Sequence, residues 1–207
     1  MEGIRMSDVI KAVIFDQGGV LSKGGGKGTN EEAASRVMGL SSTIVVPDLV
    51  EDLKRGVIDN AEYVEAINRR YPNAPVKLSD KMWDDVYASL RPEPLSYELV
   101  RQCQESGRRV GLLSNINPAT AKRFQEDGSY DGFDPLVLSC FVHCAKPDPA
   151  IYAVVEAALP DIKPGEIILL DDQDKCVRGA RKRGWQAMHV TNLQQMAQDL
   201  SRLLHLG

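Results

Sequence analysis

The chain has 207 residues, 43% hydrophobic and 26% charged, which is ordinary for a globular protein and enough for one core with a small appendage. Its formal net charge of −4 and the absence of a basic run argue against a nucleic-acid-binding surface. The apolar runs are too short to cross a membrane, and the N-terminus lacks a secretory pattern. We therefore expect a cytoplasmic protein with no nucleic-acid or membrane partner.

The four cysteines are expected to be reduced thiols, because the sequence has no pattern of a secreted protein. They are Cys103, Cys140, Cys144 and Cys176. Cys140, His143 and Cys144 are close enough in sequence to suggest zinc, but no second Cys/His pair completes four ligands at the usual spacing. A structural role is the preferred interpretation.

Residues 1–10 are expected to form a leader, and the first strand is Ala12–Phe15, an unbroken apolar run. Such a run is typical of a central strand that is buried on both faces of a parallel sheet. Asp16 follows at once, and Gly18 and Gly19 predict a sharp turn at the carboxyl end of the strand. Open α/β sheets bind ligands at that end. Asp16 is therefore a candidate site residue, although a lone Asp before two glycines more often caps a turn.

A glycine-rich stretch follows at residues 22–28. It could cradle a phosphate or act as a flexible linker. The P-loop pattern requires Ser or Thr after Gly-Lys, and here Gly28 follows instead. The linker is favoured.

The segment from Thr29 to Pro94 has helical patterns and no strand pattern. Helices are expected at 29–38, 48–55 and 60–70, and a fourth after Ser79, which would be its N-cap. The apolar spacing of Trp83, Val86 and Leu90 in the fourth helix is more typical of a core stripe than of a cofactor contact.

Beyond residue 94, strands and helices alternate, which predicts a parallel sheet with right-handed crossovers. Strands are expected at 109–113, 136–140, 167–170 and 187–190, and helices at 96–105, 117–126, 150–158, 174–183 and 193–204. The fold class is thus α/β: a Rossmann-like parallel sheet flanked by helices, with a small all-helical cap inserted after the first strand. The expected domains are a core of residues 1–23 and 95–207 and a cap of residues 24–94.

Polar residues follow the predicted core strands at four places: Asp16, Ser114-Asn115, Lys146 and Asp171-Asp172. Taken singly, the residues at each place can be explained as helix caps or solvated side chains. Together they place a candidate nucleophile, hydrogen-bond donors, a cation and a carboxylate pair on one rim of the sheet.

At these four places the chain resembles the haloacid dehalogenase superfamily of aspartate-nucleophile phosphotransferases. IFDQGGVL resembles the first motif of that family, LLSN the second, KPDPAIY the third and LLDD the fourth, in the same order and at similar spacing. The helical segment lies where the family carries its helical cap.

The resemblance implies a role for each residue. Asp16 would attack phosphorus with one oxygen and bind Mg²⁺ with the other, Gly18 would offer its carbonyl to the metal, and Asp172 would be a direct ligand supported by Asp171. Ser114 and Asn115 would donate hydrogen bonds to the phosphate. Lys146 would balance the negative charge of Asp16 and the phosphate.

Gly18 is also where the sequence departs from the family, whose phosphatases usually carry a second Asp there as the general acid and base. Cys176 likewise stands where a further acid or Asn is common. General acid–base catalysis is typically worth about 10²–10⁴ in rate. An enzyme without a general acid favours substrates with good leaving groups, such as anomeric sugar phosphates and acyl phosphates.

The leading hypothesis is a Mg²⁺-dependent phosphatase of a small phosphorylated metabolite, with sugar phosphates as the preferred class. The alternatives are a C–halogen hydrolase of the same superfamily, which needs no metal, and a weakly active regulatory protein that binds phosphate. The paired Asp171-Asp172 argues against the former, and Gly18 supports the latter. A monomer and a homodimer are both compatible with the sequence. Candidate lining residues in the cap are Lys54, Arg55, Asn60 and Tyr63.

Overall fold

The computed structural model describes residues 10–23 and 29–206. Most of the predicted leader, and the glycine-rich stretch beyond Lys23, lie outside these residues.

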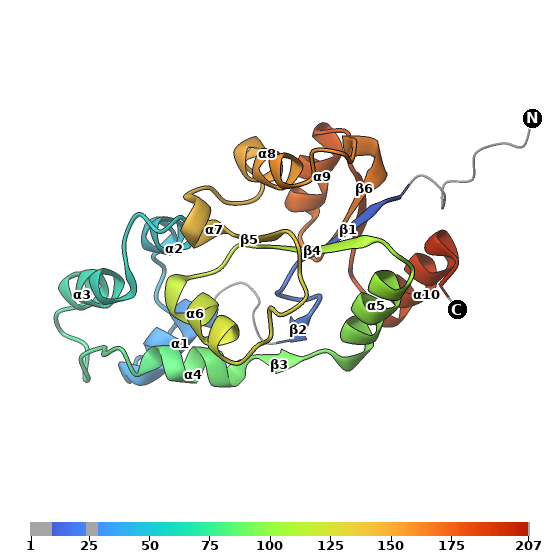
Figure 1. Cartoon of the computed structure of the whole chain (residues 1–207). Coiled ribbons are helices and arrows are strands. Elements are labelled where there is room, and N and C mark those ends of the chain that lie inside the picture. The colour runs from blue at the N-terminus through green and yellow to red at the C-terminus, as the bar shows by residue number, and fades with distance from the viewer. Residues whose placement is uncertain (1–9, 24–28, 207) are drawn as a thin grey trace, which may run out of the picture.

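Five parallel strands form the central sheet in the order β5-β4-β1-β6-β7 (Figure 1). They are β1 (Ala12–Phe15), β4 (Arg109–Ser114), β5 (Leu136–Leu138), β6 (Ile167–Asp171) and β7 (Gln186–His189). β1 is the middle strand and pairs with β4 on one side and β6 on the other. The three strands that precede candidate site residues therefore lie next to one another.

The side chains of β1 alternate between two hydrophobic clusters, one on each face of the sheet. Val13 and Phe15 belong to one cluster, Ala12 and Ile14 belong to the other, and all four are fully buried. Because successive residues of a strand point to opposite faces, a strand covered on both sides must be apolar at every position. Burying a large apolar side chain such as Phe15 is worth about 1.5–3 kcal/mol, which fixes the position of the Asp16 that follows.

Helices cover both faces of the sheet. They are α5 (Pro94–Glu105), α6 (Pro118–Glu126), α7 (Ser139–Val142), α8 (Pro149–Ala158), α9 (Asp174–Lys182), α10 (Leu193–Leu204) and the short 3₁₀ helix η2 (Pro164–Glu166). Figure 1 shows α8 and α9 on one face and α5 and α10 on the other. Tyr152 of α8 packs in the cluster of Ile14, and Leu200 of α10 packs in that of Phe15. The predicted α/β fold is confirmed.

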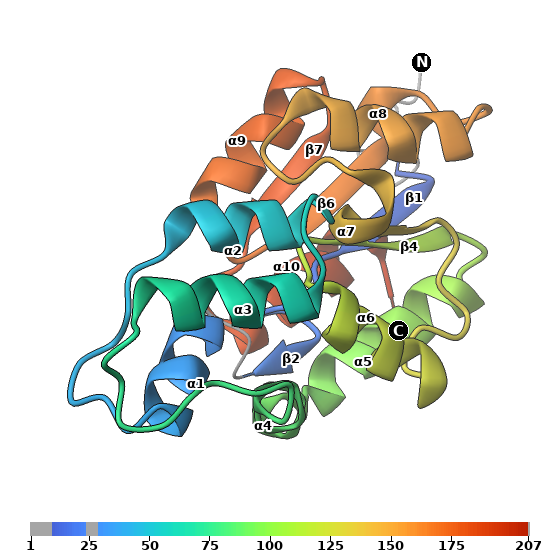
Figure 2. The ribbon, with the colours of Figure 1, turned by 90° about the vertical axis from the view of Figure 1, so that its left-hand side faces the viewer.

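Four helices form the inserted module, which we call the cap. They are α1 (Thr29–Val37), α2 (Pro47–Lys54), α3 (Asn60–Arg70) and α4 (Met82–Ser89). The cap has a hydrophobic cluster of its own, in which the rings of Tyr63 and Trp83 are in tilted contact with centroids 5.6 Å apart. Figures 1 and 2 show the cap beside the end of the sheet toward which β1 runs. The boundaries 24 and 94 stay a prediction.

The prediction that the inserted segment contains no strand is wrong. β2 (Ser22–Lys23) pairs antiparallel with β3 (Arg91–Pro92), where the chain enters and leaves the cap. Glu93 N–H donates to Leu21 O at 2.9 Å next to this pair. A strand of two residues has no periodicity to detect, and this one exists only because the two crossings meet in space.

Several element boundaries differ from the prediction by one or two residues. The strand expected to reach Cys140 ends at Leu138, and residues 139–142 form α7. The Ser139 hydroxyl accepts a hydrogen bond from Ile116 N–H, a partner that local patterns do not reveal. The N-cap of α4 is Lys81 rather than Ser79, and it makes no side-chain capping bond.

Candidate active site

Asp16 stands at the carboxyl end of β1, where its N–H donates to Leu170 O at 2.9 Å. The chain then turns tightly, because Gln17 O accepts from both Leu21 N–H and Ser22 N–H. Gln17 N–H also donates to Asp16 Oδ1 at 2.7 Å. The carboxylate is thus held by its own turn, and it is only 5% exposed.

Lys146 lies between two carboxylates. Its ammonium nitrogen is 2.9 Å from Asp16 Oδ1 and 2.6 Å from Asp171 Oδ2, and all three side chains are buried. Burial alone would lower the pKa of Lys146, but the charges of Asp16 and Asp171 outweigh it and raise the pKa. The side chain therefore stays an ammonium ion, and Asp16 Oδ2 receives no hydrogen bond from any described residue.

Asn115 holds the backbone of Lys146 at two points. Its amide nitrogen donates to Lys146 O at 2.8 Å, and its amide oxygen accepts from Lys146 N–H at 2.8 Å. Asn115 was predicted to donate to the phosphate. The structure uses its amide to position the lysine, while Ser114 at the end of β4 is buried and lines the adjoining cavity.

Asp171 and Asp172 have different surroundings. Both oxygens of Asp171 are occupied, Oδ1 by Gln173 N–H at 2.8 Å and Oδ2 by Lys146. Asp172 Oδ1 is buried with no hydrogen-bond partner, and desolvation together with Asp171 raises the pKa of Asp172. An unpartnered buried carboxylate oxygen is costly unless a cation meets it.

Asp16, Asp171 and Asp172 each offer an oxygen, and these oxygens all lie within 4.8 Å of one another. Mg²⁺ prefers such oxygen donors and keeps several waters when few carboxylates bind it. The free Oδ1 of Asp172 and the free Oδ2 of Asp16 therefore fit the predicted metal, with Asp171 committed to Lys146. Gly18 lines the adjoining cavity, and the role of its carbonyl as a metal ligand stays a prediction.

The pKa of Asp16 also agrees with a cation at this place. Burial raises the pKa of Asp16 to about 7, although the charge of Lys146 opposes the shift, and Asp171 and Asp172 add to it. A nucleophilic carboxylate has to be ionised. An added cation next to Asp16 and Asp172 would favour the ionised form.

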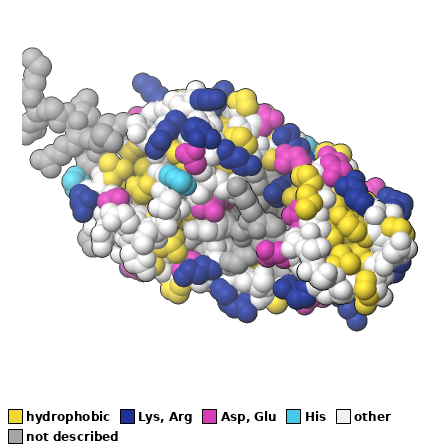
Figure 3. Space-filling model, turned by 180° about the vertical axis from the view of Figure 1, so that it is seen from behind, with side chains coloured by type: hydrophobic (Ala, Val, Ile, Leu, Met, Phe, Trp, Pro, Cys, Tyr) yellow, Lys and Arg dark blue, Asp and Glu magenta, His cyan; other side chains and the backbone are white. Residues whose placement is uncertain are grey.

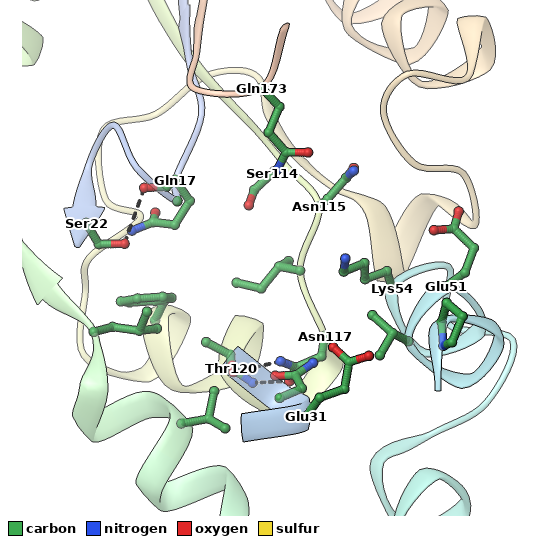
Figure 4. Close-up of a pocket in the computed structure, with 18 of the residues that line it drawn as sticks. Gln17, Ser22, Glu31, Glu51, Lys54, Ser114, Asn115, Asn117, Thr120 and Gln173 are labelled. Atoms are coloured by element: carbon green, nitrogen blue, oxygen red, sulfur yellow. Dashed lines mark hydrogen bonds between the residues drawn. The ribbon is translucent and has the colours of Figure 1, made fainter. Parts of the chain in front are cut away.

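A cavity of about 320 Å³ lies between this rim of the sheet and the cap. It reaches the turn after Asp16 through Gln17 and Gly18, and the ends of β4 and β6 through Ser114, Asn115 and Gln173. Figure 4 shows Gln17 and Ser22 on one side of the cavity and Lys54 of α2 on the other. The volume is within the range of small-molecule sites.

Of the four cap residues predicted to line a substrate site, only Lys54 lies in this cavity. Tyr63 is fully buried in the cap core. Arg55 pairs with Glu51 and Asp148, and Asn60 Oδ1 accepts from Ala119 N–H at 2.9 Å. The prediction is wrong for these three, because helix periodicity does not show which face meets the core domain.

Gln17 is a site residue that sequence reasoning passed over. Its side chain is 3% exposed, lines the cavity, and has no hydrogen-bond partner for either amide atom. The Tyr97 hydroxyl lies near this amide. Burial raises the pKa of Tyr97, and the Gln17 amide opposes part of that rise. The two side chains nevertheless do not form a hydrogen bond. The only signal in the sequence was its place next to Asp16.

Figure 3 shows Lys, Arg, Asp and Glu side chains interspersed over the face that is seen from behind. All four cysteines are free thiols and buried. No described helix is both long and apolar enough to span a membrane.

Comparison with known proteins identifies the fold. The chain resembles an enzyme of Bacteroides thetaiotaomicron described as a HAD family enzyme and solved with magnesium and inorganic phosphate: 23% identity over 86% of this chain and 93% of that one, with a TM-score of 0.69. A predicted HAD-like hydrolase of Porphyromonas gingivalis gives 20% identity over 96% and 100% of the two chains, with a TM-score of 0.76.

A third solved structure, the L-2-haloacid dehalogenase of Xanthobacter autotrophicus, gives 22% identity over 94% and 82% of the two chains, with a TM-score of 0.61. No curated protein matched significantly. The family model for haloacid dehalogenase-like hydrolases matches residues 10–184, a span that contains the turn after Asp16, Lys146 and the pair Asp171-Asp172. The chain belongs to the haloacid dehalogenase-like hydrolases.

Proposed function

We propose that this hydrolase is a Mg²⁺-dependent phosphatase of a small phosphorylated metabolite that works through an aspartyl-phosphate on Asp16. The main support is the buried Asp172 Oδ1, which has no partner and lies with Asp16 in a cluster whose oxygens are within 4.8 Å. Hydrolysis of a carbon–halogen bond has no use for such a cation site. Magnesium and phosphate in a similar fold agree with the proposal.

The residues divide the reaction between them. Asp16 forms a bond to phosphorus while the bond from phosphorus to the leaving oxygen breaks, and water then cleaves the aspartyl-phosphate to release phosphate and restore Asp16. Lys146 keeps a positive charge beside Asp16, and Ser114 can donate its hydroxyl to a phosphate oxygen. Bound Mg²⁺ would supply charge neutralisation between the carboxylates and the phosphate.

Gly18 offers no proton to the leaving oxygen. The cavity contains two carboxylates on its cap side, Glu31 and Glu51. Glu51 pairs with Arg55 at 2.7 Å, so Glu31 is the cap carboxylate best placed to take over if a proton donor is required. A sugar phosphate as the substrate stays a prediction.

Purified protein tested with 4-nitrophenyl phosphate and with 2-chloropropionate, each in Mg²⁺ or in EDTA, separates the candidate functions. We expect nitrophenolate release that requires Mg²⁺, and no chloride release. Chloride release in EDTA would overturn the proposal in favour of the dehalogenase. Binding of Mg²⁺ and phosphate without turnover of any ester would favour the regulatory protein.

A further inference from the structure

Lys54 is the last residue of α2, and its side chain extends into the cavity on the side opposite Gln17 (Figure 4). No described residue forms a hydrogen bond or an ion pair with its ammonium group. Burial lowers the pKa of Lys54, and the charge of Lys175 acts in the same direction. A half-buried cation without a partner is unfavourable unless a ligand supplies the opposite charge.

The two carboxylates near Lys54 are held elsewhere. Glu51 pairs with Arg55 at 2.7 Å, and Glu31 Oε1 accepts from Val46 N–H at 3.4 Å. Each attracts Lys54 through space, but neither lies within ion-pair distance of it. The ammonium group is therefore open to an anion in the cavity.

The backbone of Lys54 is tied to the phosphate side of the site. The Ser139 hydroxyl donates to Lys54 O at 2.7 Å and accepts from Ile116 N–H at 3.0 Å, two residues beyond Ser114. His143 Nδ1 contacts the carbonyl of the next cap residue, Arg55 O, at 3.1 Å. One core hydroxyl thus joins the β4 rim to the end of α2, which sets the spacing between Ser114 and the base of Lys54.

We propose that Lys54 binds a second anionic group of the substrate, so that the preferred substrates are phosphate monoesters whose leaving group carries a carboxylate or a second phosphate. This inference rests on the proposed phosphatase function and narrows its substrate class. The phosphoryl group would lie at Asp16 and Ser114, and the far end of the leaving group would cross the cavity to the ammonium ion.

Binding to the Asp16→Asn protein in Mg²⁺, followed by calorimetry, tests the inference without turnover. The probes are propyl phosphate, the same ester ending in a carboxylate, and propanediol bisphosphate. We expect both anionic-ended esters to bind about 10- to 100-fold more tightly than propyl phosphate, the usual strength of a hydrogen bond to a charged group. The tighter of the two identifies the second group.

The added variant Lys54→Gln should remove this preference and leave binding of propyl phosphate unchanged. The matched control is Lys81→Gln, which removes an exposed cap lysine outside the cavity and should keep the preference. Equal weakening of all three probes by Lys54→Gln would mean that Lys54 contacts the phosphoryl group, and would overturn the inference. Absence of any preference in the protein with Lys54 would overturn it as well.

Failure of the proposed function has a different signature. A protein with Asp16 intact that hydrolyses none of the three esters in Mg²⁺, while the binding preference depends on Lys54, would contradict the phosphatase and support the anion site.

Discussion

At the scale of single residues, the site depends on the three charges of Asp16, Lys146 and Asp171, all buried within ion-pair distance. Replacing Asp16 by Asn removes the proposed nucleophile but keeps the shape of the side chain and a hydrogen-bond acceptor for Lys146. We expect Asp16→Asn to lower kcat on an aryl phosphate by about a thousandfold or more, since covalent catalysis is lost. Steady-state kinetics measure the loss of kcat, and circular dichroism checks that the variant is folded. Asp199→Asn on α10 is the surface control. A folded Asp16→Asn protein with normal rates would refute the assignment.

Gly18 gives a second prediction at this scale, which needs no mutation. Because Gly18 has no side chain to protonate the leaving oxygen, charge on that oxygen goes uncompensated. The rate of the chemical step should fall steeply as the pKa of the leaving alcohol rises across a series of aryl and alkyl phosphates. Pre-steady-state kinetics can establish that chemistry is measured. A flat series would show that another group donates the proton, and Glu31→Gln is then the next variant to test.

At the scale of an element, the turn after β1 depends on a glycine other than Gly18. Gly19 has φ +73°, and a Cβ there would lie 2.6 Å from Asp172 Oδ2. The matched control is Gly107, with φ +79° and open space around it. Both alanine variants should lose about 1–2 kcal/mol of unfolding free energy from the left-handed backbone.

Only Gly19→Ala should also weaken Mg²⁺ binding, by about tenfold or more, because it displaces Asp172, the proposed ligand. Urea unfolding and metal titration by calorimetry measure the two effects separately. Equal Mg²⁺ affinity in the two variants would contradict the proposal that Asp172 binds the metal.

At the scale of the whole molecule, cap and core meet closely at the end of α2. Gly56 has φ +62°, and a Cβ there would overlap the Cys140 carbonyl of α7. Gly39 in the cap has φ +69° but only ordinary contact with Pro75 at 3.6 Å, so Gly39→Ala is the control. We expect Gly56→Ala to separate α2 from α7, which would lower kcat/KM and speed limited proteolysis between core and cap. The same proteolysis rate in both variants would argue that α2 can shift without opening the cap.

The sequence predicted the core well because its strands are apolar at every position and end in polar residues, as Ala12–Phe15 followed by Asp16 shows. It predicted the cap helices but not their orientation, so Tyr63 was assigned to a site when it belongs to the cap core. The β2–β3 pair and the contact between Asn115 and Lys146, which are 31 residues apart, arise only when distant segments meet. The pattern of residues within one segment does not indicate contacts with a distant segment. For this reason the sequence did not predict that Asn115 positions Lys146 or that the Gln17 amide is unpaired.

The β2–β3 pair has a mechanical consequence. The two crossings between core and cap are joined in one narrow seam of two residue pairs, which is stabilised by the hydrogen bond from Glu93 N–H to Leu21 O and by the ion pair of Lys23 with Glu93. Because the two connections lie side by side, we expect any movement of the cap relative to the core to be a rotation about this seam. Ser139, His143 and Asp148 hold the cap by contacts to α2 and Arg55 away from the seam. These noncovalent contacts, rather than the covalent connections, would have to break for the cap to rotate.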